Sequence, residues 1–96
     1  MIHMQEHHWK IVQSILSKYP YTFYAFGSRT KGTERRFSDF DLCFDDPIPW
    51  NTQSHIEEEF EESDLPFMVD LVDLNHCTDE FKGIIKNDLI VIQNQA

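Results

Sequence analysis

The stretch that decides the fold is GSRTKG at residues 27–32, which is followed by SDFDL at residues 38–42. Side chains alternate between the two faces of an extended strand, so Asp39 and Asp41 are expected to point to the same face. Two carboxylates this close repel each other, and burial strengthens the repulsion. The pattern therefore predicts a bound cation, and carboxylate oxygens favour Mg²⁺ or Mn²⁺.

The Gly27-Ser28 pair that precedes these carboxylates predicts a phosphate-binding turn. A glycine–serine turn that opens toward a helix exposes backbone N–H groups, which suit phosphate oxygens. Metal and phosphate together indicate the chemistry of a nucleoside triphosphate. The alternative interpretation is an ordinary strand-to-helix turn in which Ser28 caps the helix.

Length and charge restrict the classes of function. The 96 residues predict one domain that spans 1–96, and the net charge of −9 disfavours stable binding to nucleic acid or anionic lipid. Such a surface suits a basic protein partner. The N-terminus does not resemble a secretory signal, and no apolar run approaches the roughly 20 residues of a membrane span, so we expect a cytoplasmic protein. Cys43 and Cys77 are then expected to be packing groups rather than a disulfide.

Hydrophobic periodicity predicts helices that alternate with strands. The expected helices cover residues 5–18, 54–63 and 79–87, with a short helical turn within 29–36. The expected strands cover residues 22–26, 39–45, 67–74 and 89–92. Ser54 and Glu57 have the spacing of a capping box at the start of the second helix. The alternation predicts an α+β fold in which helices pack on a sheet. The expected aromatic core consists of Phe23, Phe26, Phe40, Phe44, Phe60, Phe67 and Phe81.

Asp70 is the third carboxylate of interest. It lies in the otherwise apolar stretch 67–74, which predicts a central strand buried on both faces, where an isolated charge is unfavourable. If this strand lies beside 39–45, three carboxylates converge. Two can then bridge a metal pair, while the third completes the second metal site or acts as a base. The alternative is a structural ion pair of Asp70 with Arg35 or Arg36.

The motifs at residues 27–32 and 38–42 resemble the signature of the minimal nucleotidyltransferases, small members of the DNA polymerase β-like superfamily. The resemblance covers nearly the whole chain and includes the Val-Asp-Leu-Val stretch at 69–72. It implies a polymerase β-like fold with a small mixed sheet flanked by helices. It also implies two Mg²⁺ ions at the aspartates and a triphosphate at the Gly-Ser turn. Carried over by position, the implied phosphate-binding residues are Gly27, Ser28 and Arg29, and the implied catalytic and metal-binding residues are Asp39, Asp41 and Asp70.

The same resemblance implies a biological role. Many members of this family are encoded with HEPN-domain ribonuclease toxins and act as antitoxins, some by transferring AMP from ATP to a tyrosine of the toxin. We therefore expect a metal-dependent transfer of AMP to a partner's hydroxyl group. The alternative is a binding module that neutralises its partner by occlusion alone. A kanamycin-type nucleotidyltransferase for small molecules is less favoured, because those enzymes carry an additional acceptor domain.

Overall fold

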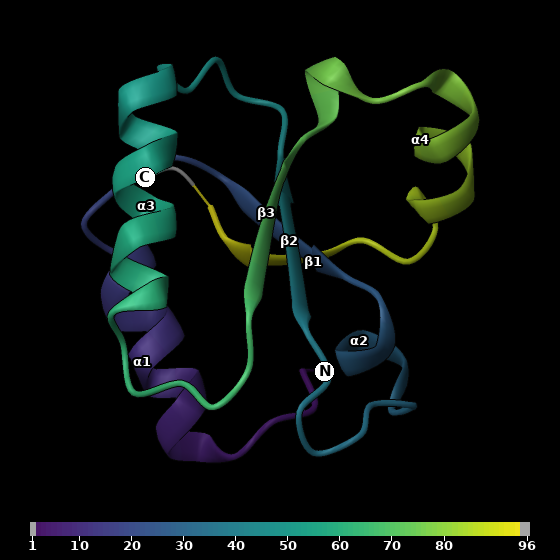
Figure 1. Cartoon of the computed structure of the whole chain (residues 1–96). Helices are drawn as coiled ribbons and strands as arrows, with labels where there is room; N and C mark the ends of the chain where they lie inside the picture. The colour runs from purple at the N-terminus through teal and green to yellow at the C-terminus, as the bar shows by residue number, and fades with distance from the viewer. Residues whose placement is uncertain (1, 95–96) are drawn as a thin grey trace.

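The computed structural model describes residues 2–94, which form four α-helices, one short 3₁₀ helix and a four-stranded sheet (Figure 1). In chain order the elements are α1 (Glu6–Leu16), β1 (Phe23–Phe26), α2 (Ser28–Lys31), β2 (Phe40–Phe44), α3 (Trp50–Glu61), β3 (Val69–Asp73), the 3₁₀ helix η1 (Leu74–His76), α4 (Asp79–Ile85) and β4 (Ile90–Gln93). Within residues 2–94, every helix is too short or too polar to cross a lipid bilayer.

The strands form a mixed sheet in the order β3-β2-β1-β4 (Figure 1). β1 pairs antiparallel with β2 and with β4, whereas β2 and β3 run parallel. Parallel neighbours need a crossover connection, and α3 forms most of the one between β2 and β3. The parallel pairing aligns Asp41 with Asp70 on neighbouring strands. The predicted α+β fold, a small mixed sheet flanked by helices, is confirmed.

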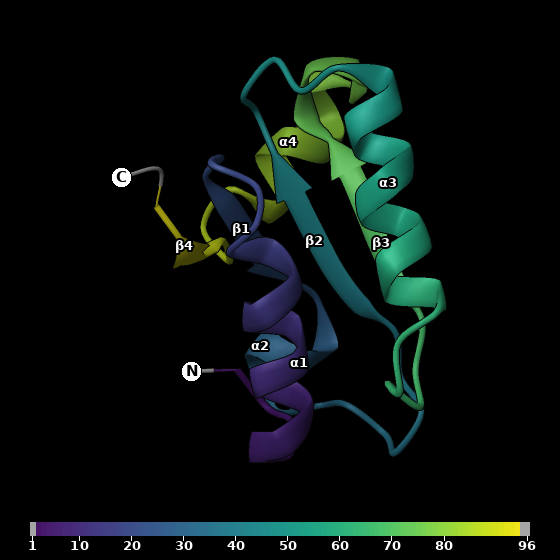
Figure 2. The same cartoon turned by 90° about the vertical axis from the view of Figure 1, so that its left-hand side faces the viewer.

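Helices α1 and α3 lie together on one face of the sheet (Figure 2). Phe23, Phe40 and Phe44 are fully buried in the core beneath them. Six of the seven phenylalanines that the sequence marks as core are buried. The exception, Phe81, is partly buried and packs edge-on against Phe26 with ring centroids 6.0 Å apart.

A second, smaller core lies on the opposite face under α4. Its buried members are Phe26, Cys43, Leu74 and Ile85. Cys43 lies near the end of β2 and Leu74 directly follows β3, so α4 covers that end of the face and does not reach the beginning of the two strands (Figure 1). Asp41 and Asp70 lie at the beginning of the two strands, where Asp41 is half-buried and Asp70 is exposed.

The predicted start of a helix at Ser54 is wrong, because α3 begins earlier, at Trp50. Pro49 occupies the N-cap with φ of −58° and ψ of 145°. Proline suits the start of a helix, since its φ is fixed near the helical value and it has no N–H to leave unpaired. The Gln53 side chain donates a hydrogen bond of 2.9 Å to the Ile48 carbonyl and so stabilises the first turn of α3. Ser54 therefore lies inside the helix and does not cap it.

The prediction of a central strand at 67–74 is also wrong, because β3 is an edge strand. The strand is rich in apolar residues because they pack against the hydrophobic cores that lie under the helices. Val69 and Leu71 pack against the larger core, and Val72 packs against the smaller core on the other face. The larger core thus covers one face of β3, the smaller core covers only the C-terminal part of the other face, and one edge stays open within residues 2–94. Asp70 is consequently exposed to solvent rather than buried.

Gln93 connects β4 to the end of α1. Its side-chain nitrogen donates to the carbonyls of Leu16, Tyr19 and Tyr21 at 3.0, 2.8 and 3.1 Å. We expect Gln93→Leu to lower the free energy of unfolding by about 1–3 kcal/mol, because these carbonyls lose a donor. Urea denaturation measures this loss. Gln13→Leu, the same change at an exposed position of α1, should stay within about 0.5 kcal/mol of the parent. Equal losses in the two variants would contradict the assignment.

Candidate active site

Gly27 forms the sharp turn between β1 and α2. It adopts φ of +87° and ψ of −161°, a backbone conformation that is open essentially to glycine alone. A Cβ atom at this position would lie 2.4 Å from Oδ2 of Asp41, so the glycine backbone packs directly against that carboxylate. The turn is closed by Thr30, whose hydroxyl and backbone N–H both donate to the Gly27 carbonyl. Gly27 rather than Ser28 occupies the N-cap, and Ser28 is the first residue of α2.

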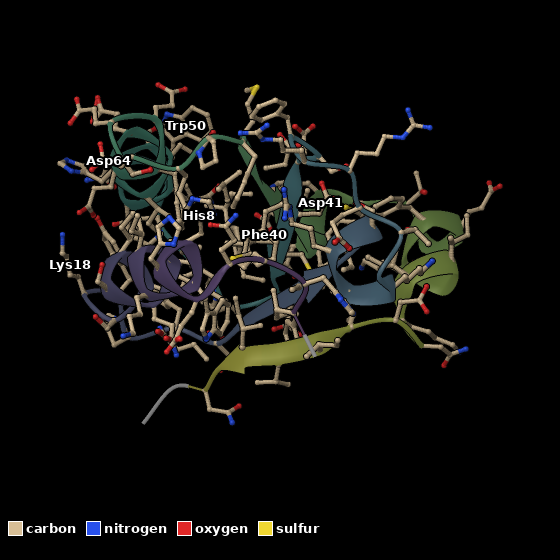
Figure 3. All side chains as sticks on the ribbon, turned by 90° about the horizontal axis from the view of Figure 1, so that it is seen from below. His8, Lys18, Phe40, Asp41, Trp50 and Asp64 are labelled. Atoms are coloured by element: carbon tan, nitrogen blue, oxygen red, sulfur yellow. The ribbon has the colours of Figure 1, made fainter. Side chains whose placement is uncertain are left out.

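Asp41 and Asp70 are brought together by the parallel pairing of β2 and β3. The side chain of Asp41 is half-buried on the face opposite to Phe40, and Figure 3 shows Phe40 on the side of α1 and Asp41 on the side of α2. The pKa of Asp41 rises from 3.8 to about 6. Burial is the largest cause, followed by the negative charges of Asp70 and Asp39 and by a side-chain hydrogen bond with Asp70.

Asp39 lies one residue before β2 and is exposed. It lies two residues before Asp41, so the alternation of a strand places both side chains on the same face. The charge of Asp39 contributes to the raised pKa of Asp41. The three aspartates that the sequence singles out are therefore neighbours at the open end of the sheet. Asp70 forms no salt bridge with Arg35 or Arg36 among the described residues, so the structural ion pair considered as an alternative does not form.

The chemistry of the three aspartate side chains suits a divalent cation. Its donors are all carboxylate oxygens, the ligands that Mg²⁺ prefers, and their mutual repulsion is what an added cation would relieve. Among residues 2–94, no three His, Cys, Asp or Glu side chains already converge as a set of metal ligands. The aspartates are close enough for Asp39 and Asp70 to influence the charge of Asp41, but their side chains do not form a ready-made set of metal ligands in the described residues.

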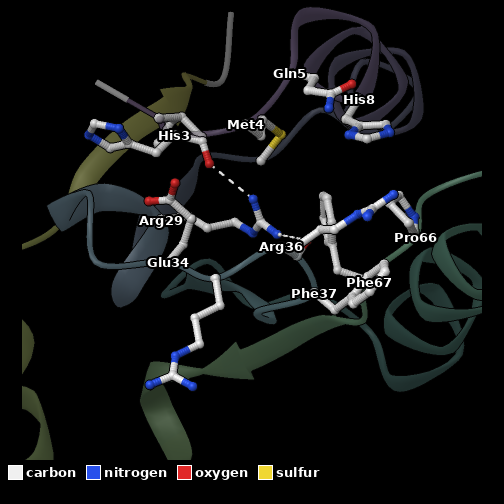
Figure 4. Close-up of a pocket in the computed structure, with 12 residues that line it drawn as sticks. His3, Met4, Gln5, His8, Arg29, Glu34, Arg36, Phe37, Pro66 and Phe67 are labelled. Atoms are coloured by element: carbon white, nitrogen blue, oxygen red, sulfur yellow. Dashed lines mark hydrogen bonds between the residues drawn. The ribbon is translucent and has the colours of Figure 1, made fainter.

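The expectation that Arg29 faces the phosphates does not agree with its contacts. The side chain is only 4% exposed. Its guanidinium donates to the carbonyls of His3, Ser38 and Arg36 at 3.0, 3.0 and 3.3 Å, and it stacks 4.0 Å above the Phe67 ring (Figure 4). All three nitrogens of the guanidinium thus donate to backbone carbonyls, and the group also contacts an aromatic ring. Arg29 fixes the loop that leads into the carboxylate strand, and burial lowers its pKa.

Loss of the Arg29 contacts should destabilise the loop that precedes Asp39. We expect Arg29→Met to lower the free energy of unfolding by about 2–4 kcal/mol, because three carbonyls lose a charged donor. Hydrogen exchange should show faster opening of residues 33–38. Arg35→Met removes the same charge at an exposed position and is the matched control. Unchanged stability of Arg29→Met would refute the structural role.

Cys43 lies on the same face of β2 as Asp41, yet it is fully buried. Burial is the main reason why its pKa rises to about 12, so the thiol stays protonated and unreactive at neutral pH. Cys77 is partly buried, and both cysteines are free thiols. These features agree with the expectation that the cysteines are packing groups.

The family follows from the comparison with known proteins. Residues 10–96 match the family described as "Polymerase beta, Nucleotidyltransferase". The chain belongs to this family of nucleotidyltransferases, as the Gly-Ser and Asp-x-Asp motifs predict. A curated relative from Haemophilus influenzae, named "Probable protein adenylyltransferase MntA", is 39% identical over 89 residues, which is 88% of this chain and 78% of the relative.

Solved structures confirm the fold. A crystal structure of a toxin–antitoxin with AMP-PNP superposes with a TM-score of 0.67 at 22% identity, over 88% of this chain and 72% of the other. A crystal structure of a mutant toxin–antitoxin MntA–HpeT gives a TM-score of 0.65 at 23% identity, over 94% of this chain and 74% of the other. The predicted polymerase β-like architecture is therefore confirmed.

Proposed function

We propose that this chain transfers AMP from ATP to a tyrosine hydroxyl of a partner HEPN-type toxin and so acts as an antitoxin. The observation that carries the proposal is the pairing of Asp41 with Asp70, together with the contact of the Asp41 carboxylate with the backbone of Gly27. The name of the Haemophilus influenzae relative, which is 39% identical, supports the reaction. The two similar crystal structures, a toxin–antitoxin with AMP-PNP and a mutant toxin–antitoxin, support a toxin as partner and a nucleotide as ligand.

We assign the metal site to the three aspartates. Asp39 and Asp41 would hold two Mg²⁺ ions, and Asp70 would complete the set, while Mn²⁺ suits the same oxygens. Such ions, when bound, supply positive charge that stabilises the attacking and leaving oxygens of a phosphoryl transfer. Repulsion among the carboxylates, which raises the pKa of Asp41, supports the assignment.

The remaining steps follow from the groups around the aspartates. The acceptor oxygen forms a bond to the α-phosphorus of ATP, the bond from that phosphorus to the bridging oxygen breaks, and pyrophosphate leaves. Asp39 and Asp41 are assigned to the two metal ions, so we assign the exposed Asp70 to accept the proton of the hydroxyl group. Gly27 and Ser28 would position the β- and γ-phosphates. Because ATP is the substrate, we place the reaction in the cytoplasm.

A labelling experiment tests the proposal. The chain is incubated with its co-encoded partner, Mg²⁺ and ATP labelled at the α-phosphate, as wild type and as the double variant Asp39→Ala/Asp41→Ala. We expect label on the partner with the wild type only. The control variant Glu58→Ala/Asp64→Ala removes two exposed carboxylates away from the site and should label the partner normally.

The rival function, neutralisation by occlusion, makes the opposite prediction. It is favoured by the net charge of −9, which suits contact with a basic toxin. If the double variant neutralises the toxin as well as the wild type does, and no label reaches any protein, occlusion is the function. The proposed transfer reaction would then be wrong.

A further inference from the structure

A groove of about 580 Å³ opens beside the three aspartates, between β3 and the C-terminal half of α3. Phe60 and Phe67 are buried in its wall, and Leu65 is partly buried beside them. Asp39 and Asp70 also line the groove, so it is continuous with the candidate active site. Anything that binds here lies next to the carboxylates to which we assign the transfer of AMP.

Two large apolar side chains stand uncovered at this groove. Phe37 is 62% exposed and Met68 is 66% exposed, and both contribute to the lining. They belong to the segments that immediately precede the carboxylate strands, so each lies two residues before an aspartate of the site. Exposed apolar residues that gather around a concave surface are typical of a binding site for another molecule.

The charge of the groove selects the kind of molecule. Glu57 and Glu61 from α3 join Asp39 and Asp70, and among the described residues 2–94 no Lys, Arg or His lines the groove. Glu57 and Glu61 hold no metal in the proposed site, and their charge repels phosphate groups, so the α3 side of the groove suits neither the triphosphate of ATP nor an RNA backbone. A peptide segment that carries positive charge and an apolar or aromatic side chain does fit.

The cations of this region line a neighbouring cavity of about 770 Å³, which shares Phe37, Pro66 and Phe67 with the groove. Arg29 and Arg36 line this cavity together with Glu34 (Figure 4). Basic and acidic walls are thus segregated at short range. The segregation leaves the acidic groove as the surface next to the active site that attracts a cationic partner.

We propose that this groove, which we call the acceptor groove, binds the segment of the partner protein that carries the acceptor tyrosine, with basic residues flanking that tyrosine. The proposal rests on the proposed function, because it places the acceptor hydroxyl beside Asp70. The aromatic ring lies against Phe37 and Met68, and the basic flanks of the segment pair with Glu57 and Glu61.

Charge reversal on α3 tests the acceptor groove without touching the aspartates. The probe is a synthetic peptide with one tyrosine between lysine and arginine residues, and its affinity is measured by fluorescence anisotropy in the presence of Mg²⁺ and AMP-PNP. We expect Glu57→Lys/Glu61→Lys to weaken binding at least tenfold. Glu58→Lys/Glu62→Lys makes the same change of charge at exposed positions outside the groove and should change the affinity less than twofold. Thermal unfolding verifies that both variants are folded.

Amide NMR spectra locate the bound peptide independently. Shifts at Phe37, Met68 and the end of α3 are expected. The acceptor groove would be overturned if the peptide does not bind, if both variants weaken binding equally, or if the shifts are confined to the basic cavity. It would also be overturned if an oligoribonucleotide displaces the peptide and causes the same shifts.

A failure of the proposed function and a failure of the acceptor groove give different results. If the peptide binds in the groove but wild-type protein transfers no AMP to the peptide or to the partner, the acceptor groove stands and the transfer reaction fails. If AMP is transferred and the charge reversal raises neither the KM for the partner nor the peptide's dissociation constant, the transfer reaction stands and the acceptor groove fails.

Discussion

Asp41→Asn is expected to abolish AMP transfer and at the same time to stabilise the metal-free protein. Loss of this central carboxylate should reduce the rate at least 10³-fold, about 4 kcal/mol of transition-state stabilisation. The gain in stability has an electrostatic cause. Burial and the charges of Asp70 and Asp39 disfavour the ionised Asp41 in the folded state, and asparagine removes that ionised group.

The pH dependence of this stabilisation has a definite sign. The pKa of Asp41 is about 6 in the folded protein against 3.8 ordinarily, so the folded state binds more protons between these values and loses stability as pH rises through them. Asp41→Asn should therefore match the wild type near pH 3.5 and exceed it above pH 6.5, by at most about 3 kcal/mol. Urea denaturation in the presence of a chelator measures the difference at each pH. A wild type that is more stable than Asp41→Asn at pH 7 would contradict this account of the site.

Gly27→Ala is expected to damage both the fold and the reaction. Its φ of +87° with ψ of −161° costs a residue with a Cβ about 1–3 kcal/mol, and the added atom would meet Oδ2 of Asp41 at 2.4 Å. Either the turn or the carboxylate must move. We expect a loss of about 2–4 kcal/mol in unfolding free energy and at least a 10²-fold loss in transfer rate, because misplacement by about 1 Å can cost that much.

Gly83 provides the matched control for this substitution. It lies in α4, and a Cβ added there meets no atom within 4 Å. Gly83→Ala should raise stability by about 0.5–1 kcal/mol, because alanine favours helices over glycine, and should leave transfer unchanged. If Gly27→Ala behaves like Gly83→Ala, the contact between the turn and Asp41 does not constrain the site.

The sequence predicted which aspartates lie together, on the condition that the strand of Asp70 is the neighbour of the strand of Asp41, while their binding of metal stays a prediction. Alternation along a strand places Asp39 and Asp41 on one face, and the parallel neighbour brings Asp70 into register with Asp41. Gly27 at the end of a strand predicts the turn. The contact between Gly27 and Asp41 was not predictable, since it depends on the antiparallel register of β1 and β2, which neither strand encodes alone.

The errors have physical causes that the local pattern hides. The stretch 67–74 is apolar because its residues pack against a core on each face, and that composition is also the mark of a central strand. Arg29 follows the Gly-Ser pair, where a basic residue suits phosphate, but three backbone carbonyls from distant segments hold its guanidinium. The acceptor groove has a weak signal in the sequence, in that Phe37 and Met68 are apolar residues placed two before Asp39 and Asp70.

The most direct test of the central claim is a crystal structure with Mn²⁺ and AMP-PNP, in which anomalous scattering locates the metal ions. The account predicts anomalous peaks within coordination distance of the carboxylates of Asp39, Asp41 and Asp70, with the triphosphate against the turn at Gly27. Metal peaks that lie away from these aspartates, or a bound nucleotide that does not approach them, would contradict it.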